Sequence, residues 1–332
     1  MRRRDFVTLL GSLSLGPSLL ATPVGAQQSK KRPTIGILGA QTEATQGKLW
    51  AGFVERLHTL GWSEGRNIAI EYRWAEARND RFEQIAAEFV KLDVDLIATS
   101  STPTVIAAKR ATSSIPIVFT NASDPVANGL VTSLNRPGGN VTGLSTQLAD
   151  TTGKRLGLLR EVVPQIHRLA VLTSADDPAA LHEAREVEAV ARSLGMDVTV
   201  TKVGNADDDL GPSFGRMKGT VDGLYVCNSN VFNKVRRRIV ALVLDARLPA
   251  IYDSAGFVEL GGLISYGPNG PALFRRAAEL ADKILRGTKP SDIPIEQPTE
   301  FFMAINLAAA KSIQVSIPDA LIHLSDRIVD DE

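Results

Sequence analysis

The sequence predicts an α/β protein made of two doubly wound lobes. Short apolar runs alternate with helix-like patterns in each half of the chain, in βαβα order. This order is typical of a parallel sheet that is covered by helices on both faces. The two halves also share a spacing, because Ile35 lies 26 residues before Gly61 and Leu169 lies 26 residues before Gly195. A chain of 332 residues is long enough for two such units.

The first half opens with the short apolar run Thr34–Gly39, whose length and flanking residues predict a buried strand. Apolar residues at helical spacing follow between positions 49 and 60, and Gly61 stands where a helix C-cap is expected. Strands are also expected at 67–72, 94–98 and 115–120, and helices at 81–92 and 104–111.

The second half repeats this scheme. Strands are expected at 168–172, 196–203, 222–226 and 250–252, and helices at 179–194 and 235–246. Repetition of strand and helix in the same order indicates a second lobe of the same kind as the first.

The chain is expected to pass between the lobes more than once. We expect crossings at 140–145, 253–262 and 289–298, with 263–266 and the helix 271–285 placed in the first lobe. Lobe 1 would then comprise 33–143 and 255–290, and lobe 2 would comprise 144–254 and 291–332. Several crossings predict a hinge, and a hinge between two lobes creates a cleft that can close.

The first 26 residues have the layout of a secretory signal. A cluster at Arg2–Arg4 precedes the apolar run Val7–Leu20, and the small residues Val24–Ala26 offer a cleavage site. The pair Arg3–Arg4 with the apolar residues that follow fits a twin-arginine signal. We therefore expect export to the periplasm; the alternative is that the segment remains as an uncleaved anchor.

Composition excludes several classes of function. Basic and acidic residues number 37 each, so no bulk charge attracts nucleic acid or an anionic membrane. One cysteine, Cys227, allows no intramolecular disulfide, and four scattered histidines do not predict a metal site. We expect no metal and no cofactor.

Enzyme motifs are weak or absent in the sequence. There is no glycine-rich dinucleotide or phosphate loop, and His182–Glu183 lacks the second histidine of a zinc motif. The segment Tyr252–Gly256 matches only the second half of a nucleophile elbow. We therefore predict that the protein is not an enzyme and assign no catalytic residue.

Loops at the carboxyl ends of the strands are the candidate ligand-binding positions, because ligands of doubly wound sheets bind there. Three loops place a capping residue before a proline, at Thr102–Pro103, Asp124–Pro125 and Asp177–Pro178, which predicts helix starts whose free amide groups suit an anion. The alternative is that these residues only cap their helices. The full set of candidates is Gln41, Thr42, Ser100, Ser101, Thr102, Ser123, Asp124, Asp176, Asn228, Ser229, Asn230, Tyr252 and Asp253. Cys227 is interpreted as a small buried residue, and Arg236–Arg238 as a solvated helix face.

A set of short motifs extends over essentially the whole mature chain, and the longest of them is Asn135–Gly143. The others are the segments 70–75, 115–119, 124–126, 261–267, 284–290 and 305–307. Together these motifs resemble those of ABC-transporter substrate-binding proteins, in the branch grouped with tryptophan- and tyrosine-binding components. The resemblance implies the type I periplasmic binding protein fold, with two Rossmann-like lobes joined by a three-segment hinge, and delivery of a small-molecule ligand to an ABC permease.

The resemblance also implies roles for particular residues. In amino-acid-binding members, the loops that match Ser100–Thr102 and Ser123–Asp124 surround the ligand carboxylate, and an acid at the position of Asn228 helps to hold the ammonium group. Asn228 cannot supply that charge. Either Asp176 or Asp253 replaces it, or the ligand is not a zwitterionic amino acid.

We therefore expect a monomeric periplasmic receptor that captures a small polar or anionic solute, such as an amino acid or a derivative. Two alternatives remain open, namely a sensory protein that presents its closed form to a membrane receptor, and an exported enzyme.

Overall fold

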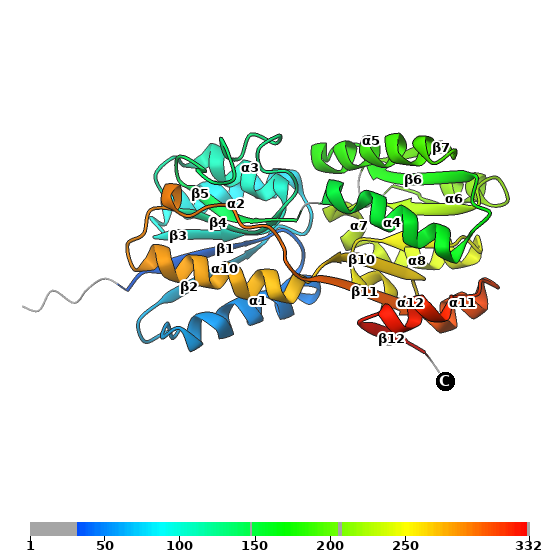
Figure 1. Cartoon of the computed structure of the whole chain (residues 1–332). Helices are drawn as coiled ribbons and strands as arrows, with labels where there is room; N and C mark the ends of the chain where they lie inside the picture. Colours follow the sequence, from blue (N-terminus) through cyan, green and yellow to red (C-terminus); the bar gives the residue numbers. More distant parts are fainter. Residues whose placement is uncertain (1–31, 147, 205–207, 331–332) are drawn as a thin grey trace, which may run out of the picture. The chain divides into compact units, whose positions relative to one another are not determined.

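The computed structural model of this protein describes residues 32–146, 148–204 and 208–330 (Figure 1). The predicted signal segment 1–26 lies outside these ranges. Among the helices in the described ranges, none combines the length and the apolar character needed to cross a bilayer.

The first lobe is built on a five-stranded parallel sheet in the order β2-β1-β3-β4-β5. Its strands are β1 (Thr34–Gly39), β2 (Ala69–Trp74), β3 (Leu96–Thr99), β4 (Ile117–Ala122) and β5 (Val141–Ser145). Two pairs of helices bury their apolar faces on the two sides of this sheet. One side carries α1 (Glu43–Thr59) and α10 (Gly270–Leu285), which lie side by side in Figure 1, and the other carries α2 (Asn79–Lys91) and α3 (Thr102–Ala111).

The second lobe contains a seven-stranded sheet in the order β12-β11-β10-β9-β8-β6-β7. Its strands are β6 (Arg168–Ser174), β7 (Asp197–Val203), β8 (Gly223–Val226), β9 (Ala250–Tyr252), β10 (Ile264–Pro268), β11 (Phe301–Asn306) and β12 (Arg327–Val329). Neighbouring strands are parallel except for β10 and β11, which are antiparallel.

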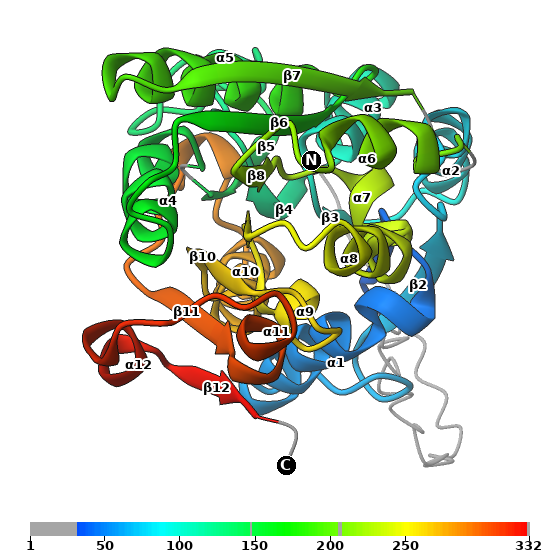
Figure 2. The same cartoon turned by 90° about the vertical axis from the view of Figure 1, so that its right-hand side faces the viewer.

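Helices cover both faces of the second sheet as well. One core contains α4 (Leu148–Val162), α5 (Pro178–Ser193), α11 (Leu307–Ser312) and α12 (Asp319–Leu324). The other contains α6 (Gly211–Met217), α7 (Asn230–Lys234), α8 (Arg236–Asp245) and α9 (Ala255–Val258). Figure 2 shows α4 on one side of this sheet and α6 and α8 on the other. A short 3₁₀ helix, η1, spans Pro290–Asp292.

The predicted likeness of the two halves is confirmed, because β7-β6-β8-β9-β10 repeats the order β2-β1-β3-β4-β5. The shared spacing also has a structural cause. Gly61 and Gly195 both follow a helix C-cap and adopt φ values of 99° and 79°. In each case the next residue donates its amide proton to a carbonyl five residues back, at 3.0 Å from Trp62 to Leu57 and from Met196 to Ala191. This pairing is the Schellman motif, and it requires a left-handed residue that glycine supplies without steric strain.

The sheets correct two expectations about the crossings. Residues 141–145, expected as an extended crossing, form strand β5 of the first sheet. Strand β10, expected in the first lobe together with the segment before it, belongs to the second sheet. It does so because Leu263 and Ile264 are buried in the second core. A Cβ atom at Gly267 would also lie 1.9 Å from the carbonyl oxygen of Asp253, so only glycine allows β10 to run this close to the end of β9.

The chain passes between the two sheets at three places: after β5, between β10 and α10, and between η1 and β11. The last crossing begins later than its predicted start, because Ile293 and Ile295 still pack in the cores of the first lobe. The isolated bridge between Leu144 and Glu296 brings the first and third crossings together.

Candidate functional site

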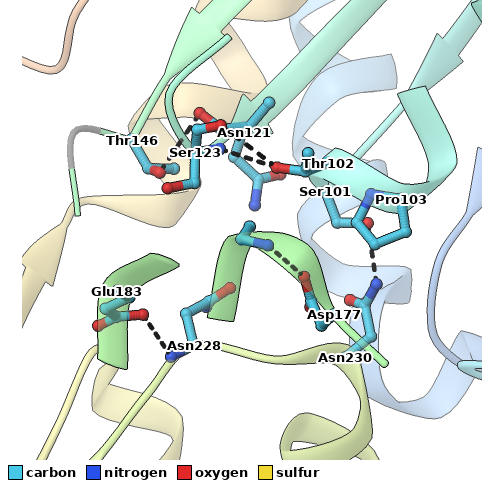
Figure 3. A pocket seen from close by; sticks show the side chains of 12 residues that line it. Ser101, Thr102, Pro103, Asn121, Ser123, Thr146, Asp177, Glu183, Asn228 and Asn230 are labelled. Carbon is cyan, nitrogen blue, oxygen red and sulfur yellow. Dashed lines mark hydrogen bonds between the residues drawn. The ribbon is translucent and has the colours of Figure 1, made fainter. Parts of the chain in front are cut away.

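The carboxyl ends of parallel strands in both sheets border one cleft, and side chains from both lobes line a cavity in it (Figure 3). The first lobe contributes residues that follow β3, β4 and β5, and the second contributes residues of α5 and residues that follow β8. The lining consists of Ser101, Thr102, Pro103, Asn121, Ala122, Ser123, Thr146, Asp177, Ala179, Glu183, Asn228 and Asn230. This is the location that the doubly wound topology favours for a ligand.

In the first lobe, hydrogen bonds hold the loops after β3 and β4 together. The amide of Ser101 donates to the carbonyl of Asn121 at 2.7 Å, and the amide of Ser123 donates to Thr102 Oγ1 at 3.0 Å. Ser101 is the N-cap of α3, so the amide groups of the first helical turn lie next to the loop that ends at Ser101. The Thr102 hydroxyl therefore joins the two loops.

Ser101 has an unusual backbone for a residue with a side chain. Its φ of 76° and ψ of 150° lie in a region that is essentially reserved for glycine and that costs other residues about 1 to 3 kcal/mol. Asp124, in the neighbouring loop, has a φ of 33°. Such strain concentrates at ligand-binding loops.

The helix expected after Asp124–Pro125 is replaced by a turn. Asp124 Oδ1 accepts the amide of Ala127 at 3.0 Å, and the carbonyl of Asp124 accepts the amide of Asn128 at 3.0 Å. The second oxygen of Asp124 lies 4.0 Å from Nε2 of His182 on α5, in the other lobe. Of the three expected helix starts, the one at Asp177 matches most directly, since its carboxylate accepts the amides of Ala179 and Ala180.

The second lobe places a buried ionic network beneath its side of the cavity. Arg155 and Glu183, which are 0% and 2% exposed, form an ion pair at 2.9 Å. Glu183 also accepts hydrogen bonds from the Tyr225 hydroxyl at 3.0 Å and from the amide of Asn228 at 2.9 Å. The side chain of Asn228 donates to the carboxylate of Asp253. Asn228 is therefore held between two acidic side chains.

Burial controls the ionisation of these groups. It raises the pKa of Asp253 above the usual value, although the charge of Arg155 opposes the shift. Burial also raises the pKa of Asp177 to about 6, against the effect of the two amides that donate to it. The pKa of Cys227 is raised by burial too, which keeps its thiol protonated and agrees with its interpretation as a small buried residue.

A chain of hydrogen bonds crosses the cleft between the lobes. Gln41 Nε2 donates to the backbone carbonyl and to Oδ1 of Asn230, both at 2.9 Å. Asn230 Nδ2 in turn donates to Ser101 Oγ at 2.9 Å (Figure 3). Three of the candidates named from the sequence thus contact one another across the cleft.

Other candidates lie away from this cavity. Tyr252 does not line the cavity, since its side chain is 0% exposed and its ring stacks on Phe257 at 4.7 Å within the second core. Ser100 is fully buried and accepts a hydrogen bond from Gln46 at 3.2 Å. Thr42 precedes α1, where its hydroxyl meets that of Thr45. Ser229 caps α7, and Asp176 and Ser229 line a neighbouring hollow that shares Pro103, Asp177 and Asn230 with the cavity.

Sequence reasoning missed Arg155 and Glu183. Glu183 lies on the buried face of α5 between Ala180 and Val187, and Arg155 is buried beside Leu156. A charged residue within the apolar stripe of a helix was the available signal, because such a residue is buried only when it is paired.

Comparisons with known proteins agree with this geometry. The model of the family described as ABC transporter substrate binding protein matches residues 41–329. A curated relative, the tyrosine-binding protein of Clostridioides difficile, is 30% identical over 287 residues, which cover 86% of this chain and 82% of the relative.

Two solved structures share the fold over 90% of this chain. The ABC domain in complex with L-Trp from Streptococcus pneumonia has a TM-score of 0.84 at 22% identity and is covered completely. The ligand-free, open structure of a substrate-binding protein with adhesive properties from Clostridium difficile has a TM-score of 0.66 at 27% identity, with 99% of it covered. The match to the family model and to the curated relative leads to one conclusion: the chain belongs to the family of ABC transporter substrate-binding proteins.

Proposed function

We propose that this protein is the extracytoplasmic solute-binding component of an ABC importer, and that it captures a small polar or anionic organic solute, such as an amino acid or a derivative, without altering it. The observation that carries the proposal is the hydrogen-bonded chain Gln41–Asn230–Ser101, which joins the two lobes over a polar cavity. A receptor that works by closure needs such contacts at its cleft.

The size of the cavity supports a mechanism in which the lobes open and close. Its volume of about 20 Å³ corresponds to about one water molecule. An organic solute therefore enters only when the lobes separate, and the three crossings are the segments that would bend. The lower TM-score to the open relative, despite its higher identity, agrees with a closed arrangement.

The first lobe would bind the acidic group of the solute. Ser101, Thr102 and Ser123 line the cavity at the start of α3 and in the adjoining loop, and the amides of a helix start and serine hydroxyls both donate hydrogen bonds to a carboxylate. The strained backbone of Ser101 supports this role, because it holds the loop at a cost of about 1 to 3 kcal/mol to stability.

The second lobe would bind a positively charged group of the solute, if the solute has one. Glu183 and Asp253 contact Asn228 from two sides, so two acidic side chains stand here with the single cation Arg155. Of the two acids weighed as replacements for an acid at position 228, the geometry favours Asp253, since its carboxylate accepts a hydrogen bond from the side chain of Asn228.

Calorimetry of the mature chain with a panel of amino acids and small organic acids tests the proposal. Ser101→Ala and Asn228→Ala are expected to weaken binding by about 5- to 30-fold each, because each loses a polar contact in the cleft. Ser193→Ala, an exposed serine at the end of α5, is the matched control and should leave affinity unchanged. Ligands whose binding survives both cleft substitutions would refute the site.

Further measurements test the remaining parts of the proposal. Mass spectrometry should recover the bound solute unchanged, whereas a product would indicate an enzyme. Export by the twin-arginine route predicts that the double variant Arg3→Lys, Arg4→Lys stays in the cytoplasm in cell fractionation. Light scattering should give the mass of one chain.

A further inference from the structure

A second cavity adjoins the candidate site and shares Asn121, Thr146 and Asn228 with it. Its volume is about 160 Å³, compared with about 20 Å³ for the candidate site itself. The first lobe contributes Leu49, Leu273 and Phe274 to its lining, and the second lobe contributes Asn233, Arg236 and Asp253. A solute that fills both cavities would therefore meet apolar side chains and a cationic group as well as the polar groups of the candidate site.

Arg236 is the cation in this second cavity, and it is the first residue of α8. Its guanidinium lies against α9, because a Cβ atom at Gly256 would be 3.0 Å from Arg236 Nη1. The side chain is partly buried, and burial lowers its pKa. Burying a cation in this way is unfavourable unless an anion compensates it.

In the described part of the chain, Arg236 forms no hydrogen bond and no ion pair. The charge of Glu259 acts on it, but Glu259 is itself paired with Arg327. Asp253 lines the same cavity and accepts a hydrogen bond from Asn228. The next two residues of α8 differ from it, since Arg237 is exposed and Arg238 pairs with Asp209 at 2.7 Å. The interpretation of Arg236–Arg238 as one solvated face is therefore wrong for Arg236.

We propose that Arg236 binds a second anionic group of the solute, and that the solute is a small organic dicarboxylate, with or without an amino group. This inference rests on the proposed function, which assigns the first carboxylate to the loop of Ser101. The second carboxylate would pair with the guanidinium, whose planar donors bind a carboxylate in bidentate fashion. Leu49, Leu273 and Phe274 would pack against the methylene groups or the ring between the two acidic groups.

Calorimetry with matched pairs of probes tests this inference. Each pair differs by one carboxylate: glutamate against glutamine, 2-aminoadipate against norleucine, and adipate against hexanoate. At least one dicarboxylate should bind at least 10-fold more tightly than its partner, because hydrogen bonds to a charged group are worth about 1.5 to 3 kcal/mol.

Substitutions then assign the preference to Arg236. Arg236→Gln should weaken binding of the preferred dicarboxylate by about 10- to 100-fold and change the affinity for its monocarboxylate partner by less than about 3-fold. Arg236→Lys should fall between, since lysine keeps the charge but loses the planar pair of donors. Arg237→Gln, the matched control on the same helix, should bind as the unmodified protein does.

The outcomes distinguish this inference from the proposed function. Tight binding of a monocarboxylate that depends on Ser101 but not on Arg236 would overturn the inference and keep the function. Absence of binding across a panel that includes these dicarboxylates would overturn both. Thermal unfolding provides the folding control. Arg236→Gln should be at least as stable as the original chain, because the substitution removes a partly buried cation that forms no ion pair within the described residues.

Discussion

The side-chain amide of Asn230 donates a hydrogen bond to Ser101 Oγ at 2.9 Å, although the two residues belong to different lobes and lie 129 positions apart. Asn230 also accepts two bonds from Gln41, so one asparagine side chain and its backbone connect three loops. These contacts stabilise closure of the cleft even before a solute contributes to it.

Asn230→Ala should shift the protein towards its open form. The substitution removes two of the three hydrogen bonds across the cleft, each worth about 1 kcal/mol, which changes the ratio of closed to open protein by about 10-fold or more. Small-angle scattering without added solute should show a larger radius of gyration than for the original chain. Lys234→Ala, exposed on the same helix, is the control, and identical profiles for Asn230→Ala and the original chain would contradict the prediction.

Glu183→Gln should destabilise the second lobe by about 3 kcal/mol or more. Arg155 is completely buried, and removal of the partner charge leaves its guanidinium poorly compensated. Urea unfolding measures the loss. Tyr225→Phe, which removes only one hydrogen bond to Glu183, should cost about 1 kcal/mol. Equal losses of unfolding free energy for the two variants would show that the ion pair stabilises the fold no more than the single hydrogen bond from Tyr225.

Asp177 should make stability depend on pH between about 4 and 6. Its pKa is raised from 3.8 to about 6 in the folded protein, so the native state binds more protons than the unfolded state in that interval, and stability falls as the pH rises. The loss is at most about 3 kcal/mol and is complete above pH 6.

Asp177→Asn removes this titration and keeps an oxygen that accepts the amides at the start of α5. Unfolding free energies measured from pH 4 to 7 should fall for the original chain relative to this variant. Parallel curves for the two proteins would contradict the raised pKa of Asp177.

Asp222 should have the opposite effect at lower pH. The side chain of Arg168 and the amides of His167 and Arg168 donate to its carboxylate, and its pKa is lowered to about 2. Its contribution is therefore present above about pH 4 and is lost as the pH falls towards 2. Asp222→Asn should cost about 1 kcal/mol at pH 7, since solvent screens this partly exposed pair, and nothing near pH 2. A cost that does not change with pH would exclude a role for its charge.

Local patterns in the sequence were sufficient to predict most strands and helices. The strand at 34–39 was predicted with the bounds that the structure has, since an apolar run followed by a loop depends only on neighbouring residues. The equal spacing of Gly61 and Gly195 from the strands before them was informative for the same reason, because both positions need a left-handed residue after a helix.

Predictions that depended on distant contacts were less successful. Residues 263–266 were expected in the first lobe, but the lobe that holds them was decided by burial of Ile264 in the second core and by the close approach of Gly267 to Asp253. Asp124–Pro125 carried a helix-start pattern, and the chain there forms a turn instead. Helix α4 and strands β11 and β12 were not predicted at all.

The sequence by itself determined the repeated α/β order of this protein, the polar loops that follow its strands and the resemblance to substrate-binding proteins, because these depend on residues close together in the chain. Only the tertiary structure decided which of those polar groups meet. The pairing of Arg155 with Glu183 and the bond between Asn230 and Ser101 join residues that are far apart in sequence. The placement of Arg236 in the cleft, without a hydrogen bond or ion pair from the described residues, also depends on the tertiary structure, because only the surrounding fold decides whether a charge is paired or exposed.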